Sequence, residues 1–177
     1  MSVNWFNPDG LFVKFGTNEA APTKVGEIST WGLLREVEVR MDLATATGTP
    51  GTVVIQDHNI RFPVGTVFQQ VDLYTQIVAT GATATLDVGL IRTDETTAIN
   101  LTGLIAGETV ANLGNLASIR IYEAAASTPA GVTGGGLITG ATALVFPGLL
   151  TARANTAAFT AGLIRLRIKY FVPTTLT

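Results

Sequence analysis

The sequence predicts an all-β fold: an antiparallel β-sandwich of jelly-roll type, preceded by an extended N-terminal arm. Several stretches alternate apolar and polar residues with the period of two that a half-buried strand requires. The 19 glycines and 7 prolines punctuate these short stretches, and segments with helical periodicity are scarce. A length of 177 residues fits a single domain. We therefore expect the arm and a first strand at 1–32 and the sandwich at 33–177.

Four stretches show the clearest alternation, and they lie at 33–43, 65–80, 83–91 and 162–172. In the first, Val37, Val39, Met41 and Leu43 would face the core. In the second, the same face would hold Val67, Val71, Leu73 and Ile77. In the third it would hold Leu86, Val88 and Leu90. In the last it would hold Ile164, Leu166, Ile168, Tyr170 and Val172, and Pro173 would end the strand because it cannot extend a central ladder.

The remaining elements are predicted from weaker signals. The short link at 79–84 contains Gly81 and predicts a β-hairpin between the second and third of these strands. Further strands are expected at 11–15, 52–55, 59–62, 99–105, 117–122 and 142–146. One or two helical turns are expected within 108–117, where apolar residues recur every three positions and Glu108 lies early.

Composition excludes several classes of function. The net charge is −2 and the pI is about 5.3, which provides no electrostatic footprint for nucleic acid or an anionic membrane. The absence of cysteine excludes disulfides, thiolate zinc sites and cysteine nucleophiles. The longest apolar candidate, 137–150, is too short for a membrane span and contains Pro147. We expect no cofactor and no metal.

Candidate catalytic residues have simpler explanations. His58 is the single histidine, and its neighbour Asp57 would point to the opposite face in a strand or lie beside it in a surface turn. Glu36 and Glu38 lie about 7 Å apart along one strand face, a spacing that also occurs in glycosidases. Nearby arginines favour a solvated charged face instead. Asp94-Glu95 is most simply a turn, so we expect no enzymatic activity.

Two further motifs favour structural roles. The stretch 133–140, TGGGLITG, contains the glycines of a phosphate loop but lacks its lysine and hydroxyl residue, so a flexible loop is the better interpretation. Arg165, Arg167 and Lys169 form a basic row on one strand face. Cross-strand pairing with an acidic row such as Glu36 and Glu38 explains it without invoking nucleic acid.

One long stretch is free of charge. Residues 124–152 contain no charged side chain, although charged residues are already only 14% of the whole chain, against about 25% in ordinary domains. Charges are depleted at the centres of protein interfaces. We therefore expect Leu137 and Ile138, two large apolar residues of this stretch, to lie in an interface with a partner.

The N-terminal segment is rich in aromatic residues. Asn7-Pro8-Asp9-Gly10 is a β-turn sequence, and a short strand would follow it. The aromatic side chains on either side of this turn are Trp5, Phe6, Phe12 and Phe15. Such side chains supply large contact area with few rotatable bonds, as interface anchors do. They either anchor the arm to a partner or fill the core of their own subunit.

Two stretches carry a resemblance to a known family. NPDGLFVKFG followed by LLREVEVRMDL, and IRFPVGTVFQQVDLYTQIVATGATATLDVGL, resemble segments of capsid decoration (cement) proteins of tailed bacteriophages. The resemblance covers about residues 5–105, and it describes fold and lineage. Residues 106–177 agree with the family only in general character.

The resemblance implies a virion structural protein without catalysis. Such a protein is made in the host cytoplasm and sits on the outer surface of the capsid as a homotrimer. It bridges neighbouring copies of the major capsid protein and binds neither nucleic acid nor membrane. The alternatives are another β-sandwich virion component, such as a head-fibre base, a tail protein or a minor capsid protein, and, less favoured, a sugar-binding jelly-roll module.

Overall fold

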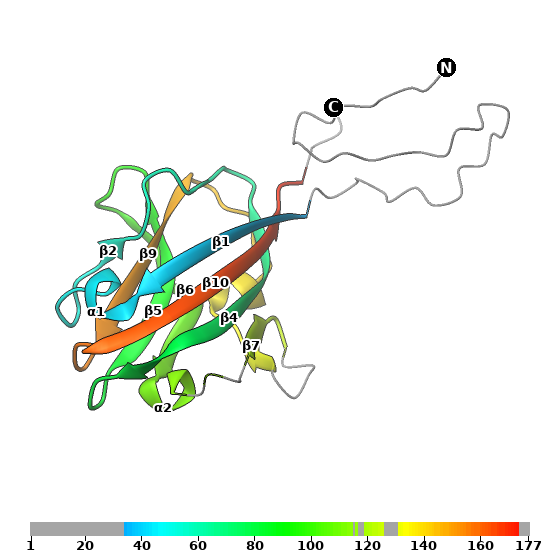
Figure 1. Ribbon diagram of the computed structural model, residues 1–177. Helices are drawn as coiled ribbons and strands as arrows, with labels where there is room; N and C mark the ends of the chain where they lie inside the picture. The colour runs from blue at the N-terminus through cyan, green and yellow to red at the C-terminus, as the bar shows by residue number, and fades with distance from the viewer. Residues whose placement is uncertain (1–33, 115, 117–118, 126–130, 174–177) are drawn as a thin grey trace, which may run out of the picture. The chain divides into compact units, whose positions relative to one another are not determined.

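The computed structural model describes residues 34–114, 116, 119–125 and 131–173, and within them the chain forms two β-sheets packed face to face (Figure 1). The first sheet has the strand order β1-β10-β4-β7-β8. Its strands are β1 (Arg35–Asp42), β10 (Ala161–Phe171), β4 (Val67–Thr80), β7 (Ile119–Glu123) and β8 (Gly131–Thr133). All pairs in this sheet are antiparallel except β7 with β8.

The second sheet has the order β2-β9-β5-β6, and β3 also pairs with β9. Its strands are β2 (Val54–Ile55), β3 (Arg61–Phe62), β9 (Gly148–Asn155), β5 (Thr85–Arg92) and β6 (Ala98–Thr109). Three single-turn helices lie between strands: α1 (Leu43–Ala46), α2 (Val110–Leu113) and α3 (Gly136–Thr139). An all-β sandwich is therefore confirmed, and no helix in the described part of the chain is long and apolar enough to cross a membrane.

The core lies between the sheets, where the alternating positions meet. On β10, Ile164, Leu166 and Ile168 are fully buried, as the sequence predicts. The facing strand β5 buries Leu86, Val88 and Leu90. At one end, Phe62, Phe68 and Tyr170 pack as an aromatic cluster, with ring centroids of Phe62 and Phe68 5.0 Å apart in an edge-on arrangement.

The predicted hairpin around Gly81 is wrong. β4 pairs with β10 and β7, whereas β5 pairs with β6 and β9, so the link carries the chain from one sheet to the other. Gly81 has φ +144°, and a Cβ there would lie 2.6 Å from the carbonyl oxygen of Ala158. A turn between two sheets and a hairpin within one sheet both need such a glycine. The local sequence therefore does not distinguish the two kinds of turn.

The strand predicted at 142–146 is also wrong. Those residues form a loop that exposes 73% of Val145 and 42% of Phe146, and the strand β9 begins only after Pro147. β9 is paired on both sides, with β2 and with β5, and consecutive residues along most of its length are buried. It therefore shows no alternation that a sequence pattern could detect.

Ile77 departs from its predicted position. It is 54% exposed, although Val71 and Leu73 on the same strand are fully buried. The register between β4 and β10 shifts on either side of the Ile77–Leu163 pair. A bulge reverses the face on which the following side chains project. A further register shift between Lys169 and Tyr170 brings Phe68 into the core, so the alternation predicted for 65–80 holds only from Val71 to Thr75.

Candidate interaction surfaces

The six predicted partner-contact residues fall into two groups. Trp5, Phe6, Phe12 and Phe15 lie outside the described residues, as do the predicted strand 11–15 and the arm at 1–32. Leu137 and Ile138 lie in α3, and only 9% and 1% of their surfaces are exposed. Both side chains belong to the subunit's own core, so little of either remains to contact a partner.

The candidate catalytic residues lie at the surface. His58 is in a turn, and its Nδ1 is 3.0 Å from Oε1 of Glu95, with both side chains at least half exposed. Asp57 accepts a hydrogen bond from the backbone N–H of Asn59, so it closes the turn and does not orient the histidine. The described residues contain no group of three or more potential metal ligands.

The turn at Asp94 is fixed by its own carboxylate. The backbone N–H groups of Thr97 and Thr96 donate to Asp94, and these hydrogen bonds lower the pKa of Asp94 from 3.8 to about 2. A carboxylate held by two backbone donors is the usual device of a tight turn. The interpretation of Asp94-Glu95 as a turn is confirmed.

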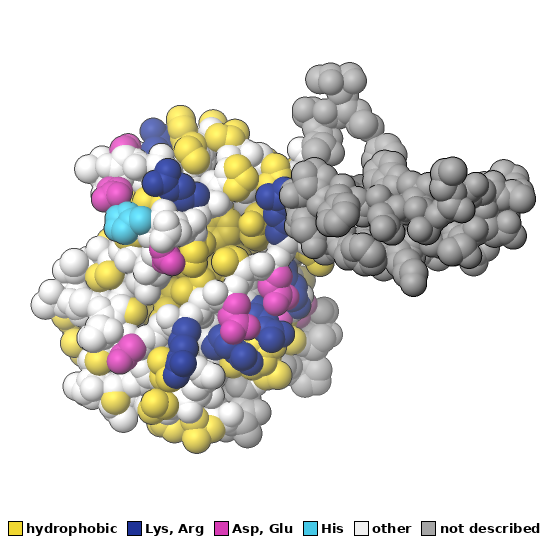
Figure 2. All heavy atoms as spheres, turned by 45° about the horizontal axis from the view of Figure 1, so that its top comes forward, with side chains coloured by type: hydrophobic (Ala, Val, Ile, Leu, Met, Phe, Trp, Pro, Cys, Tyr) yellow, Lys and Arg dark blue, Asp and Glu magenta, His cyan; other side chains and the backbone are white. Residues whose placement is uncertain are grey.

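A row of paired charges covers the outer face of β1, β10 and β4, and we call it the charged ladder (Figure 2). It consists of Glu36, Glu38, Arg165, Arg167, Lys169 and Asp72. Arg167 Nε lies 3.0 Å from Glu38 and 3.7 Å from Glu36, and Lys169 Nζ lies 2.9 Å from Asp72. The predicted cross-strand pairing is confirmed, and the two glutamates are therefore held as ion-pair partners.

An aromatic ring completes the charged ladder. The guanidinium groups of Arg165 and Arg167 lie 4.8 and 5.5 Å from the centroid of the Tyr74 ring. The hydrogen bond to Glu38 raises the pKa of Arg167 above its ordinary value. The face is ordered by contacts within one subunit, which makes it a rigid polar surface with no charge of one sign in excess.

Besides Asp72 of the charged ladder, which is only 5% exposed, sequence reasoning missed two buried carboxylates. Asp87, 2% exposed, accepts hydrogen bonds from Arg153, Asn155 and the backbone N–H of Gly107. The alternation of β5 assigned Asp87 to an outer face, which is correct, but the neighbouring side chains cover it. A carboxylate in this environment is tolerable only because each of its oxygens has a partner.

The second buried carboxylate joins the two sheets. Glu108 of β6 is 4% exposed and accepts hydrogen bonds from Arg120 and from the Tyr122 hydroxyl, both on β7. Burial, with a further contribution from the charge of Glu108, raises the pKa of Tyr122 well above its ordinary value. The sequence suggested Glu108 as an early residue of a helix, and no sequence signal marks its partners across the sandwich.

One end of the sandwich exposes apolar side chains, and we call it the apolar end surface. Its members are Leu34, Val64, Val145 and Phe146, which are 58%, 54%, 73% and 42% exposed. β1 begins at this end and β10 finishes there, since Arg35 pairs with Tyr170. The guanidinium of Arg92 lies 3.5 Å from the centroid of the Phe146 ring.

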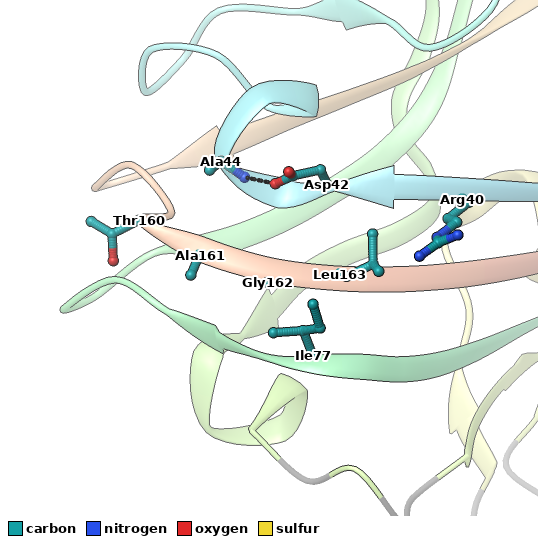
Figure 3. Close-up of a pocket in the computed structure, with 8 residues that line it drawn as sticks. All are labelled: Arg40, Asp42, Ala44, Ile77, Thr160, Ala161, Gly162 and Leu163. Atoms are coloured by element: carbon teal, nitrogen blue, oxygen red, sulfur yellow. Dashed lines mark hydrogen bonds between the residues drawn. The ribbon is translucent and has the colours of Figure 1, made fainter.

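A shallow depression of about 590 Å³ lies near the other end of β4 (Figure 3). Its lining comes from the end of β1, from Ile77 and from the start of β10. Asp42, its acidic residue, accepts a hydrogen bond from the backbone N–H of Ala44 and so caps α1. The remaining lining includes Arg40, Thr160 and Gly162, which together contain no nucleophile–base pair.

Comparisons with solved structures find a similar fold in chains of bacteriophage capsid structures. No protein-family model matches the chain, and no curated protein sequence matches it. A chain of the cyanophage Pam1 capsid asymmetric unit has a similar fold, with a TM-score of 0.50 and 19% identity over 89% of this chain and 98% of that one. A chain of the capsid of Ralstonia phage GP4 gives a TM-score of 0.49 and 16% identity over 80% of this chain and 86% of that one. The chain therefore has a β-sandwich fold with a counterpart in a phage capsid structure.

Proposed function

We propose that the chain is a structural protein of a bacteriophage virion that decorates the outer capsid and bridges neighbouring copies of the major capsid protein. The observation that carries the proposal is the similarity in fold to a chain of the cyanophage Pam1 capsid, which extends over nearly the whole of both chains. The sequence resemblance to decoration proteins of tailed phages supports the same assignment independently of the fold. The function needs no catalysis.

We also propose that the sandwich is of jelly-roll type. The strand order supports this, because the chain changes sheet at every connection except β2 to β3, β5 to β6 and β7 to β8. In each sheet, strands from the two ends of the chain lie side by side, as β1 and β10 do. Two interleaved Greek keys would produce this order.

Contacts with partners are assigned to the N-terminal arm and to apolar surface. Trp5, Phe6, Phe12 and Phe15 would anchor the arm to capsid protein or to another subunit, because aromatic side chains dominate such contacts. Leu137 and Ile138 would act indirectly, by holding the loop around α3 in place from within the core. A homotrimer would let three weak contacts act together through avidity.

The proposal is tested on purified virions of the phage that encodes the chain. Mass spectrometry is expected to find the chain in a fixed ratio to the major capsid protein, and a density map is expected to place the sandwich outside the shell. Density at the tail or at a unique vertex would assign it to another virion component instead. Absence from virions would contradict the proposal.

The oligomeric state is tested separately on the purified chain. Size-exclusion chromatography with light scattering is expected to report three times the mass of one 18.5 kDa chain. A monomer at all concentrations would contradict the proposed homotrimer. It would not test the capsid assignment, which is tested by the virion experiment. An array of glycans provides the control for the sugar-binding alternative, and we expect no binding.

A further inference from the structure

The strand β1 forms one edge of the first sheet, with β10 on its inner side (Figure 1). No strand in the described part of the chain pairs with its other side. An edge strand of 8 residues presents a row of backbone donors and acceptors on which another chain can pair. The other sheet margins are shorter or partly occupied: β2 and β8 have only 2 and 3 residues, and the N–H of Gly135 donates to the carbonyl of Leu104 on β6. The strand β1 is therefore the edge best suited to bind a further strand.

Arg40 places an uncompensated positive charge at this edge. Its direct neighbour across the sheet is Arg165 of β10, and like charges in directly opposite positions repel each other. Arg165 is paired with Glu38 and contacts the Tyr74 ring. Arg40 is exposed and forms no ion pair with any residue that the structure describes. An acid is therefore missing on the side of Arg40 that faces away from β10.

Glu36 is the acid of β1 that is least engaged by its own subunit. Glu38 is held by two arginines, since Arg167 Nε lies 3.0 Å from one of its carboxylate oxygens and Arg165 Nη1 lies 3.6 Å from the other. Glu36 lies 3.7 Å from Arg167, which is beyond hydrogen-bond distance, and 45% of its side chain is exposed. The outer face of β1 thus carries a weakly held acid and an unpaired base.

We propose that β1 pairs antiparallel with β1 of a second copy of this chain, with Glu36 of each copy opposite Arg40 of the other. Directly opposite residues of an antiparallel pair share one face of the sheet, so both new ion pairs lie on the outer face. Val37 and Val39 face each other on the inner face. The pairing continues the first sheet of one subunit into the next and supplies the acid that Arg40 lacks.

The charges of β1 favour this register over its neighbours. A shift of two residues is the smallest that keeps the apolar side chains on the inner face. In one direction it brings Glu36 opposite Glu38 of the other copy, and in the other direction it brings Glu36 opposite Asp42. In the proposed register the like charges that meet are the two Glu38 side chains, and each of them is already paired with Arg165 and Arg167.

The contact has two-fold symmetry, so it differs from the interface of the proposed homotrimer, which needs a three-fold axis. Only residues 35–41 of each strand would pair, and an interface this small belongs to the weak class. A homotrimer would carry three such edges, and the contact would then link trimers side by side. The inference concerns the chain itself and does not depend on finding the chain in a capsid.

Sedimentation velocity of the full chain at increasing concentration tests the contact. The weight-average mass is expected to rise above its value in dilute solution, and added salt is expected to oppose the rise because the ion pairs are exposed. Arg40→Glu and Glu36→Arg each place like charges opposite one another at both positions, and each is expected to weaken the association by about ten-fold or more. Arg61→Glu makes the same charge reversal at an exposed residue of the other sheet and should leave the association unchanged.

A mixture of the two variants identifies the partner as a second copy. When an Arg40→Glu chain meets a Glu36→Arg chain, opposite charges face each other at both positions. An equimolar mixture is therefore expected to associate as the unaltered chain does, although each variant alone does not. Should either variant not fold, the chain with both substitutions repeats the test, because it also restores opposite charges at both positions.

Three results would overturn the proposal. A mixture that associates no better than the separate variants would show that the two residues do not face each other. Stronger association of Glu36→Arg alone would show that Glu36 lies opposite an acid, as in the register with Asp42. An unaltered chain that does not associate at any concentration would show that β1 binds no second copy. None of these results bears on whether virions contain the chain.

Discussion

Arg120 Nε lies 3.1 Å from Oε2 of Glu108, and this contact joins β7 of one sheet to β6 of the other. The Tyr122 hydroxyl donates to the same carboxylate. Two side chains of β7 thus hold a buried acid of β6, which is the edge strand of the opposite sheet.

Glu108→Ala is expected to destabilise the sandwich strongly. Removal of the carboxylate leaves Arg120 and the buried Tyr122 hydroxyl without their acceptor, and breaking a buried pair in this way costs about 3–5 kcal/mol. Urea denaturation measures the change in the free energy of unfolding. Glu38→Ala, which removes an exposed partner of Arg167, is the control and should have a much smaller effect. Equal losses in the two variants would contradict the argument.

Gly89→Ala is expected to prevent normal packing of β5. A Cβ at this position would lie 2.1 Å from the carbonyl oxygen of Asn100 and 2.4 Å from the carbonyl carbon of Leu101, both of which are backbone atoms. We expect a loss of about 3 kcal/mol, the upper end of the usual range for overpacking, because a central strand cannot move away from its neighbour without disrupting the sheet. Gly114→Ala is the matched control, since its nearest atoms lie at 3.4 Å and its φ is −84°. Thermal unfolding of both variants checks the prediction.

Ile138→Ala is expected to cost about 2–5 kcal/mol, the usual range for truncation of a fully buried aliphatic side chain. Val145→Ala, seven residues further along the chain, should change the stability by no more than about 0.5 kcal/mol because its side chain is mostly in solvent. Denaturant titration of both variants provides the comparison. A stable Ile138→Ala protein would argue for a contact with a partner in place of a core role.

Asp94 is expected to make stability depend on pH in the acid range. Its pKa is about 2 in the folded chain, against 3.8 for the ordinary group, because Thr97 and Thr96 donate to the carboxylate. As the pH falls, Asp94 therefore takes up a proton in the unfolded chain before it does so in the folded chain. The stabilisation by the Asp94 carboxylate is present above pH 3.8 and is lost as the pH falls toward 2. Carboxyl NMR titration should report the low pKa, and Asp94→Asn should make the acid-dependent loss of stability less steep. An Asp94 pKa near 3.8 in the NMR titration would contradict the stabilisation of the carboxylate by the turn.

The parts of the fold that face water on one side could be predicted from the sequence. β1 and β10 alternate cleanly because one face of each carries the charged ladder, and the pairing of Arg167 with Glu38 follows from that pattern. The single turn α2 also lies within its predicted range. Alternation works here because a half-buried strand gives each residue one of two contrasting environments.

The rest could not be predicted because its determinants are distant in sequence. β9 is buried on both faces, so its residues show no contrast between environments. Asp87 is buried only because Arg153 and Asn155 cover it, and they follow it by more than sixty positions. The turn at Gly81 has the same local sequence requirements whether it joins strands of one sheet or of two.

The position of β10 within the first sheet determines when that sheet can form during synthesis of the chain. β10 lies between β1 and β4, and its continuous register with β1 runs from the Arg35–Tyr170 pair to the Asp42–Leu163 pair. During translation, β1 emerges more than a hundred residues before β10, the strand with which it pairs in the described part of the chain. Pairing of β1 with β10 must therefore close a very long loop, which slows this pairing and leaves β1 without β10 on the nascent chain. We expect a ribosome-bound chain that stops before residue 161 to resist protease poorly, and the same chain to become protected once β10 has been added.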